Sequence, residues 1–203
     1  MISKVTFAQI LDEFYFANQL AASGPLGSRS DVVKVIQDKT TGNFIVAGTY
    51  KGGVALDISN PLNTTFSISV TSVQSFVAMY NSSGKYLWSA SIYSSPTSAN
   101  DSVLVSSIDV DDVGNIYVVG RVNVTSGDTI RVSSPYTIKK YLGIVNRAAF
   151  FTRINPYNPS DPDQYIDVIP ASSSATVFIN DCKFVKLGGV PTLILAGKFK
   201  GGV

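Results

Sequence analysis

The chain has 203 residues, a formal net charge of +2 and no histidine. Without histidine it cannot form a Ser-His-Asp triad, a Cys-His pair, a histidine general base or nearly any catalytic zinc site, so we predict no catalytic residue and no cofactor. Charged residues make up 15% of the sequence, against roughly 25% in average soluble domains. This low charge favours packing inside an assembly. The small net charge gives no argument for nucleic-acid binding, which usually requires a clustered basic face.

The N-terminal segment, residues 1–24, predicts one amphipathic helix over residues 6–22. Thr6-Phe7-Ala8-Gln9 has the capping-box pattern, and Gly24-Pro25 would end the helix. Two uses of the helix stay open: packing on the chain's own sheet, or docking another subunit through an aromatic cluster that consists of Phe7, Phe14, Tyr15 and Phe16. The segment is too short and too charged to cross a bilayer, so no transmembrane segment is predicted.

A repeated segment then sets the organisation of the chain. The sequence at 42–48, Gly-Asn-Phe-Ile-Val-Ala-Gly, returns at 114–120 as Gly-Asn-Ile-Tyr-Val-Val-Gly, and a weaker copy at 191–197 ends in Leu-Ala-Gly. Such self-similarity is typical of stacked copies of one supersecondary unit. We place the first repeat at 25–100, the second at 101–175 and a partial third at 176–203.

Each copy predicts about four strands, because runs rich in Val, Ile, Phe and Tyr alternate with Gly, Asn, Asp and Ser. The turns at 38–43 and 111–115 predict hairpins, in which Gly42 and Gly114 supply a backbone conformation that side chains resist. Gly48 and Gly120 are expected at strand ends, as turn or close-packing positions. More strand follows the glycines where a phosphate-binding loop would need a helix.

These residues resemble the seven-bladed β-propeller repeat family, often abbreviated SBBP. The resemblance covers about residues 31–125 and rests on the Gly-Asn hairpin, the strand at 76–80 (Phe-Val-Ala-Met-Tyr) and the Gly84 to Trp88 strand. It implies an all-β fold of propeller type with four-stranded antiparallel blades. Such repeats are found in bacterial surface proteins and large DNA viruses, which implies a virion or surface location.

About two and a third copies cannot close a propeller, which needs four to eight blades. Two explanations follow: the chain is the N-terminal part of a longer product, which we favour, or neighbouring subunits complete its sheets. The number of blades stays open.

One constellation resembles the opening of a calcium loop. Asp109 and Asp111 occupy its first and third positions, with Asp112 beside them, but Val113 and Gly120 stand where later ligands are needed. We therefore interpret the segment as an acidic hairpin turn and keep the three carboxylates as a weak metal candidate. Cys182 is alone in an apolar strand and is expected to be buried. Asn-x-Ser/Thr sequons occur at Asn63, Asn81, Asn100 and Asn123, and whether they carry glycans stays open.

The sequence favours a non-enzymatic structural or interaction module of a large assembly, with protein partners. One alternative is a carbohydrate- or ligand-binding module using the aromatic residues Tyr50, Tyr93, Tyr136 and Tyr157. A second is an enzyme whose active residues lie in blades outside this chain. The fold-level part of this argument is an analogy, because one fold supports many functions.

Overall fold

The computed structural model describes residues 4–8, 17–22, 28–57, 65–67, 72–95, 101–124, 128–133, 135–142, 147–171 and 176–200. These residues form sixteen strands in four antiparallel sheets and contain no helix, which confirms the all-β prediction. The described residues therefore include no helix long and apolar enough to cross a membrane.

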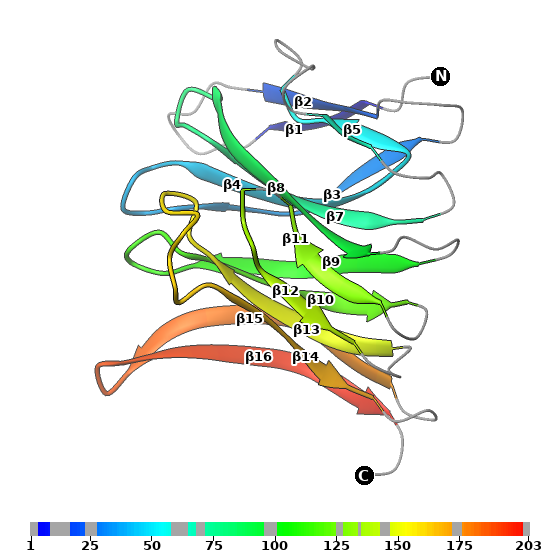
Figure 1. Ribbon diagram of the computed structural model, residues 1–203. Helices are drawn as coiled ribbons and strands as arrows, with labels where there is room; N and C mark the ends of the chain where they lie inside the picture. The colour runs from blue at the N-terminus through cyan, green and yellow to red at the C-terminus, as the bar shows by residue number, and fades with distance from the viewer. Residues whose placement is uncertain are drawn as a thin grey trace.

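The four sheets follow one another along the chain and lie in layers, from the N-terminal strands at the top of Figure 1 to the C-terminal strands at the bottom. In hydrogen-bonded order, sheet 1 is β1 (Lys4–Ala8), β2 (Ala17–Ala22), β5 (Gly53–Ala55) and β6 (Thr65–Ser67). Sheet 2 is β12 (Lys139–Tyr141), β11 (Thr129–Val132), β8 (Tyr86–Ser95), β7 (Gln74–Tyr80), β4 (Phe44–Lys51) and β3 (Arg29–Gln37). Sheet 3 is β14 (Tyr165–Pro170), β13 (Arg147–Ile154), β10 (Ile116–Asn123) and β9 (Ser102–Val110), and sheet 4 is β15 (Thr176–Leu187) with β16 (Val190–Lys200).

The same four-stranded meander occurs twice, as β3-β4-β7-β8 and as β9-β10-β13-β14, and β15-β16 matches its first two strands. A hairpin inserted between the second and third strands joins the sheet before it. β5 pairs with β2 of sheet 1, and β11 pairs with β8 of sheet 2. Each inserted hairpin therefore links one meander to the sheet before it. Across the described residues the sheets form an open series without a closed barrel or ring.

Glycines 48, 120 and 197 lie inside β4, β10 and β16, so the expectation that Gly48 and Gly120 fall at strand ends was wrong. Beside each of them the pairing with the first strand shifts by one residue. A Cβ on Gly48 would lie 2.3 Å from the Asp31 carbonyl oxygen, and one on Gly120 would lie 2.2 Å from that of Leu104. The strand passes too close to its bulged neighbour for any side chain.

Apolar side chains fill the layers between the sheets. Ile45 and Ala47 of β4 face sheet 3, whereas Val46 and Tyr50 on the opposite side face sheet 1. Val119 of β10 packs in a smaller cluster against sheet 4. Because side chains alternate along a strand, a sheet buried on both faces needs a continuous apolar run, which the repeated Gly-to-Gly segment supplies.

The predicted N-terminal helix is not what the described residues form. Lys4–Ala8 and Ala17–Ala22 are strands, paired from Lys4 with Ala21 to Ala8 with Ala17. β2 continues this pairing to β5, so the segment satisfies a sheet edge that the inserted hairpin would otherwise leave open. A local helical spacing is overridden by this long-range pairing. Residues 9–16, with Phe14, Tyr15 and Phe16, lie outside the described residues.

The short hairpin turns gather at one end of the strands, which we call the turn end (at the left of Figure 1). Gly42 and Gly114 adopt φ angles of 74° and 89°, as predicted. The strands β9, β13 and β15 begin at the opposite end, and β4, β10 and β16 finish there. We call this the crossover end.

Candidate functional site

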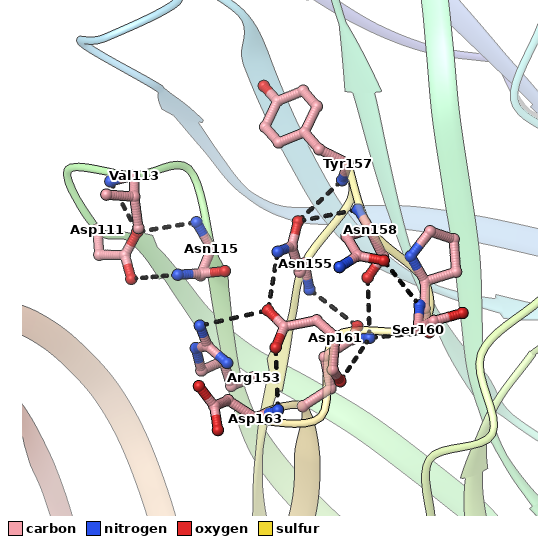
Figure 2. A network of polar contacts seen from close by, with 12 residues as sticks. Asp111, Val113, Asn115, Arg153, Asn155, Tyr157, Asn158, Ser160, Asp161 and Asp163 are labelled. Atoms are coloured by element: carbon pink, nitrogen blue, oxygen red, sulfur yellow. Dashed lines mark hydrogen bonds and ion pairs between the residues drawn. The ribbon is translucent and has the colours of Figure 1, made fainter.

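Among the three predicted carboxylates, Asp111 accepts hydrogen bonds from its own turn. Its Oδ1 accepts hydrogen bonds from the backbone N–H groups of Val113, at 3.0 Å, and Asn115, at 2.8 Å. Its Oδ2 accepts from the Asn115 amide at 2.7 Å and the Tyr117 hydroxyl at 3.2 Å. Figure 2 shows part of this arrangement. Burial and the neighbouring Asp111 carboxylate raise the pKa of Tyr117 to about 12.

Asp109 and Asp112 have other partners. Asp109 accepts from Lys183 Nζ at 3.0 Å and from the Phe184 backbone N–H at 2.6 Å. Asp112 pairs with Lys186, whose ammonium lowers the pKa of the exposed Asp112 carboxyl. The structure therefore brings these three carboxylates to three separate contacts, two of them to β15. Among the described residues no group of three or more His, Cys, Asp and Glu side chains could hold a metal.

A second polar network, in the turn 155–164, lies beside Asp111 (Figure 2). The Asn155 amide donates to Asp161 Oδ2 at 2.8 Å, and Arg153 lies 3.5 Å from the same oxygen. Asn155 and the Asp163 backbone N–H stabilise the ionised form and lower the pKa of Asp161. Tyr157 covers the neighbouring turn, since a Cβ on Gly114 would lie 2.8 Å from its ring. These contacts hold the long turn against sheet 3.

A line of polar side chains crosses the first strands of three successive sheets. Lys34 of β3 donates to Ser107 Oγ of β9 at 2.7 Å and to Asp181 Oδ1 of β15 at 2.8 Å, and Ser107 also donates to Asp181. All three directly follow the register shift of their strand. Hydrogen bonds from Lys34 and Ser107 lower the pKa of Asp181 to about 2. Sequence reasoning missed this line, because the three residues stand at different distances before Gly48, Gly120 and Gly197 and become equivalent only through strand pairing, opposite Ala47, Val119 and Ala196.

The aromatic residues of the ligand-binding alternative do not share a surface. Tyr50 is buried in the core with its hydroxyl 2.7 Å from Ser91 Oγ. Tyr136 is buried edge-on against Trp88. Tyr93 is half-buried within β8, and Tyr157 at the turn end is exposed. Four residues so divided cannot form one stacking platform for a sugar.

Cys182 is buried, as predicted, in the small apolar cluster between sheets 3 and 4. Burial raises the pKa of its thiol to about 11, so the group is a poor nucleophile at neutral pH. Of the predicted interaction residues, Phe7 lies in β1, where it pairs with Asn18 of β2.

Sheet 4 carries the most open surface of the described fold. β16 pairs only with β15 among the described residues, whereas its counterparts β4 and β10 pair with a third strand as well. Its exposed apolar side chains include Val190 (63%), Ile194 (46%) and Phe199 (52%). A long unpaired edge with apolar side chains is a template for another strand.

Gly197 gives this open edge a specific feature. In sheet 2 the third strand pairs Phe76 with Gly48, and in sheet 3 it pairs Phe150 with Gly120. Gly197 occupies the equivalent register opposite Ile179, but its nearest described neighbours are backbone atoms of Phe178 and Ile179. Unlike Gly48 and Gly120, it has no aromatic ring atom among its three nearest described neighbours.

Comparison with known proteins adds no relative: no protein-family model matches the chain, and neither a curated protein nor a solved structure resembles it significantly.

Proposed function

We propose that this chain is a structural or interaction module of a large assembly, built on a propeller-type repeat, whose sheet 4 accepts further strands. The observation that carries the proposal is the open edge of β16 with the uncovered Gly197. In both complete meanders the equivalent edge pairs with a strand that places phenylalanine on the glycine. Sheet 4 thus consists of the first two strands of a meander, and the third and fourth strands of such a meander occur twice in the fold, as β7-β8 and as β13-β14.

The chemistry of the accepted strand follows from these two internal examples. It runs antiparallel to β16 and carries a phenylalanine opposite Gly197, as β13 does opposite Gly120. Backbone hydrogen bonds supply affinity in such strand addition, while side-chain pockets supply selectivity. The low charge and the resemblance stated above favour a virion or surface-layer assembly.

A peptide with the sequence of residues 147–154 tests this proposal. We expect it to bind the chain at least about tenfold more tightly than the same peptide with alanine in place of Phe150, because the alanine peptide leaves the glycine uncovered. Hydrogen exchange gives the location: amides of β16 should become protected, while those of the edge strands β3 and β9 should not change.

A variant of the chain supplies the matched control. Ile194→Lys puts a charge on the open sheet and should weaken peptide binding, whereas Val113→Lys changes a more exposed apolar residue at the turn end and should not. Equal binding of the two peptides, or protection spread over all edge strands, would contradict the proposed docking.

A further inference from the structure

A pocket of about 240 Å³ lies at the crossover end, between sheet 3 and the start of β15. Strands β9, β10, β13 and β15 all contribute to its lining. Its polar and aromatic side chains come from Ser102, Arg121, Asn123, Arg147, Thr176 and Phe178. None of them takes part in the turn networks or in the polar line of the first strands.

The two arginines lie on the same face of sheet 3. β10 and β13 pair Asn123 with Arg147 and Arg121 with Ala149, so the arginines are diagonal neighbours across the two strands. Neither forms an ion pair with a described residue, in contrast to Arg29 and Arg153, which both have aspartate partners.

None of the residues that line this pocket is acidic. Asp101, directly before β9, is buried and accepts a hydrogen bond from Ser94 at 3.2 Å. The positive charge is reinforced by Lys198, which lies 5.3 Å from the centre of the Phe178 ring. The chain is nearly neutral overall, but this pocket is strongly cationic.

Phe178 also positions one of the arginines. The guanidinium carbon of Arg121 lies 5.4 Å from the ring centre, within the range of a cation–π contact. Such a contact orients the planar guanidinium and leaves its N–H groups free to donate elsewhere. Arg147, which has no such contact with a ring among the described residues, is the more adaptable donor.

We infer that this pocket binds the oxyanion group, a carboxylate or a phosphate, of a small ligand. Arginine pairs bind such groups through parallel N–H···O bonds, and Ser102, Thr176 and Asn123 offer further donors around the pocket. The volume is below the roughly 300–1,000 Å³ of sites that enclose a drug-sized ligand, so the pocket takes the anionic end of a molecule. This inference does not depend on strand docking at β16.

Isothermal titration and NMR of the arginine Nε–H groups test the inference with three probes: inorganic phosphate, glucuronate as a sugar carboxylate, and glucose as a neutral control. We expect phosphate, glucuronate or both to bind and to shift the Arg121 and Arg147 signals, with affinity falling as salt rises. The preferred probe identifies which oxyanion the pocket selects. No binding by either anion, or equal binding of glucose, would overturn the inference.

Variants distinguish a specific anion-binding site from non-specific electrostatic attraction of anions to the protein. Arg147→Gln should weaken anion binding at least about tenfold, since it removes a charge-assisted donor. Arg29→Gln removes the same charge at a residue that does not line the pocket and should leave affinity unchanged. Arg147→Lys keeps the positive charge but lacks the planar set of guanidinium N–H donors, so it should bind anions with intermediate affinity. This variant still tests the inference if Arg147→Gln fails to fold. Equal losses in Arg147→Gln and Arg29→Gln would refute the site.

Discussion

Phe150 lies so close to Gly120 that a Cβ built on the glycine would come within 2.7 Å of the ring. Phe76 and Gly48 repeat this relationship in sheet 2, where the corresponding distance is 2.5 Å. The two pairs occupy the same register between the second and third strands. The absence of a side chain on the glycine therefore leaves room for the phenylalanine ring as well as for the close approach of the neighbouring backbone.

Gly120→Ala should lower the free energy of unfolding by about 1–3 kcal/mol or more, because the new methyl group collides with the Leu104 carbonyl oxygen and with Phe150. Chemical denaturation monitored by fluorescence measures the loss. Gly42→Ala is the control: nothing lies within 4 Å of its Cβ position, and only the left-handed backbone penalty of about 1–2 kcal/mol applies. A smaller loss in Gly120→Ala than in Gly42→Ala would show that the strands relax around the methyl group.

The repeat could be predicted from the sequence because its glycines and turns are marked by short sequence patterns. The Gly42 and Gly114 hairpins needed only a few adjacent residues to predict, since positive φ angles select glycine. The structural requirement for glycine at position 120 could not be predicted, because Phe150 and Leu104 approach it from other strands. Strand interiors reveal such close approaches only once pairing is known.

Long-range pairing also explains what sequence reasoning missed. Lys34 and Asp181 are 147 positions apart, and no local pattern links them. In the N-terminal segment a local pattern gave a wrong prediction. Thr6 and Gln9 fit the start of a helix, but the structure pairs Thr6 with Gln19 between two strands. Asp111 and Asp112 lie at the hairpin turn, whereas Asp109 lies in β9, and the lysine partners of Asp109 and Asp112 on β15 could not be foreseen.

Asp111→Ala should destabilise the protein by about 1–3 kcal/mol, because two backbone N–H groups and the Asn115 amide lose their acceptor in a partly buried turn. Thermal unfolding measures the change. Millimolar Ca²⁺ should leave the melting temperature of the unmodified chain unchanged, since Asp109 and Asp112 are held by other partners. Calcium stabilisation that disappears in Asp111→Ala would instead mean that the turn rearranges around the ion.

Asp181 gives the chain an acid-sensitive contact. Its pKa is about 2 in the folded protein against 3.8 without the interaction, so the folded state favours the ionised carboxylate. The stability that this ionisation provides is present above about pH 4 and is lost as the pH falls from 3.8 towards 2. Because 61% of the side chain is exposed, we expect a contribution below about 1 kcal/mol.

Unfolding of the Asp181→Asn variant measures this contribution. The difference in unfolding free energy between the unmodified chain and the variant should be constant from neutral pH down to about pH 5 and should shrink between pH 4 and pH 2. Asp163→Asn, at an exposed carboxylate without an ion pair among the described residues, should not reproduce this pH profile. Adding salt should reduce the difference at neutral pH, because ions screen an exposed pair. A difference that depends on pH but not on salt would show that Ser107 holds the carboxylate by hydrogen bonding, with Lys34 contributing nothing, whereas a difference independent of pH would contradict the lowered pKa of Asp181.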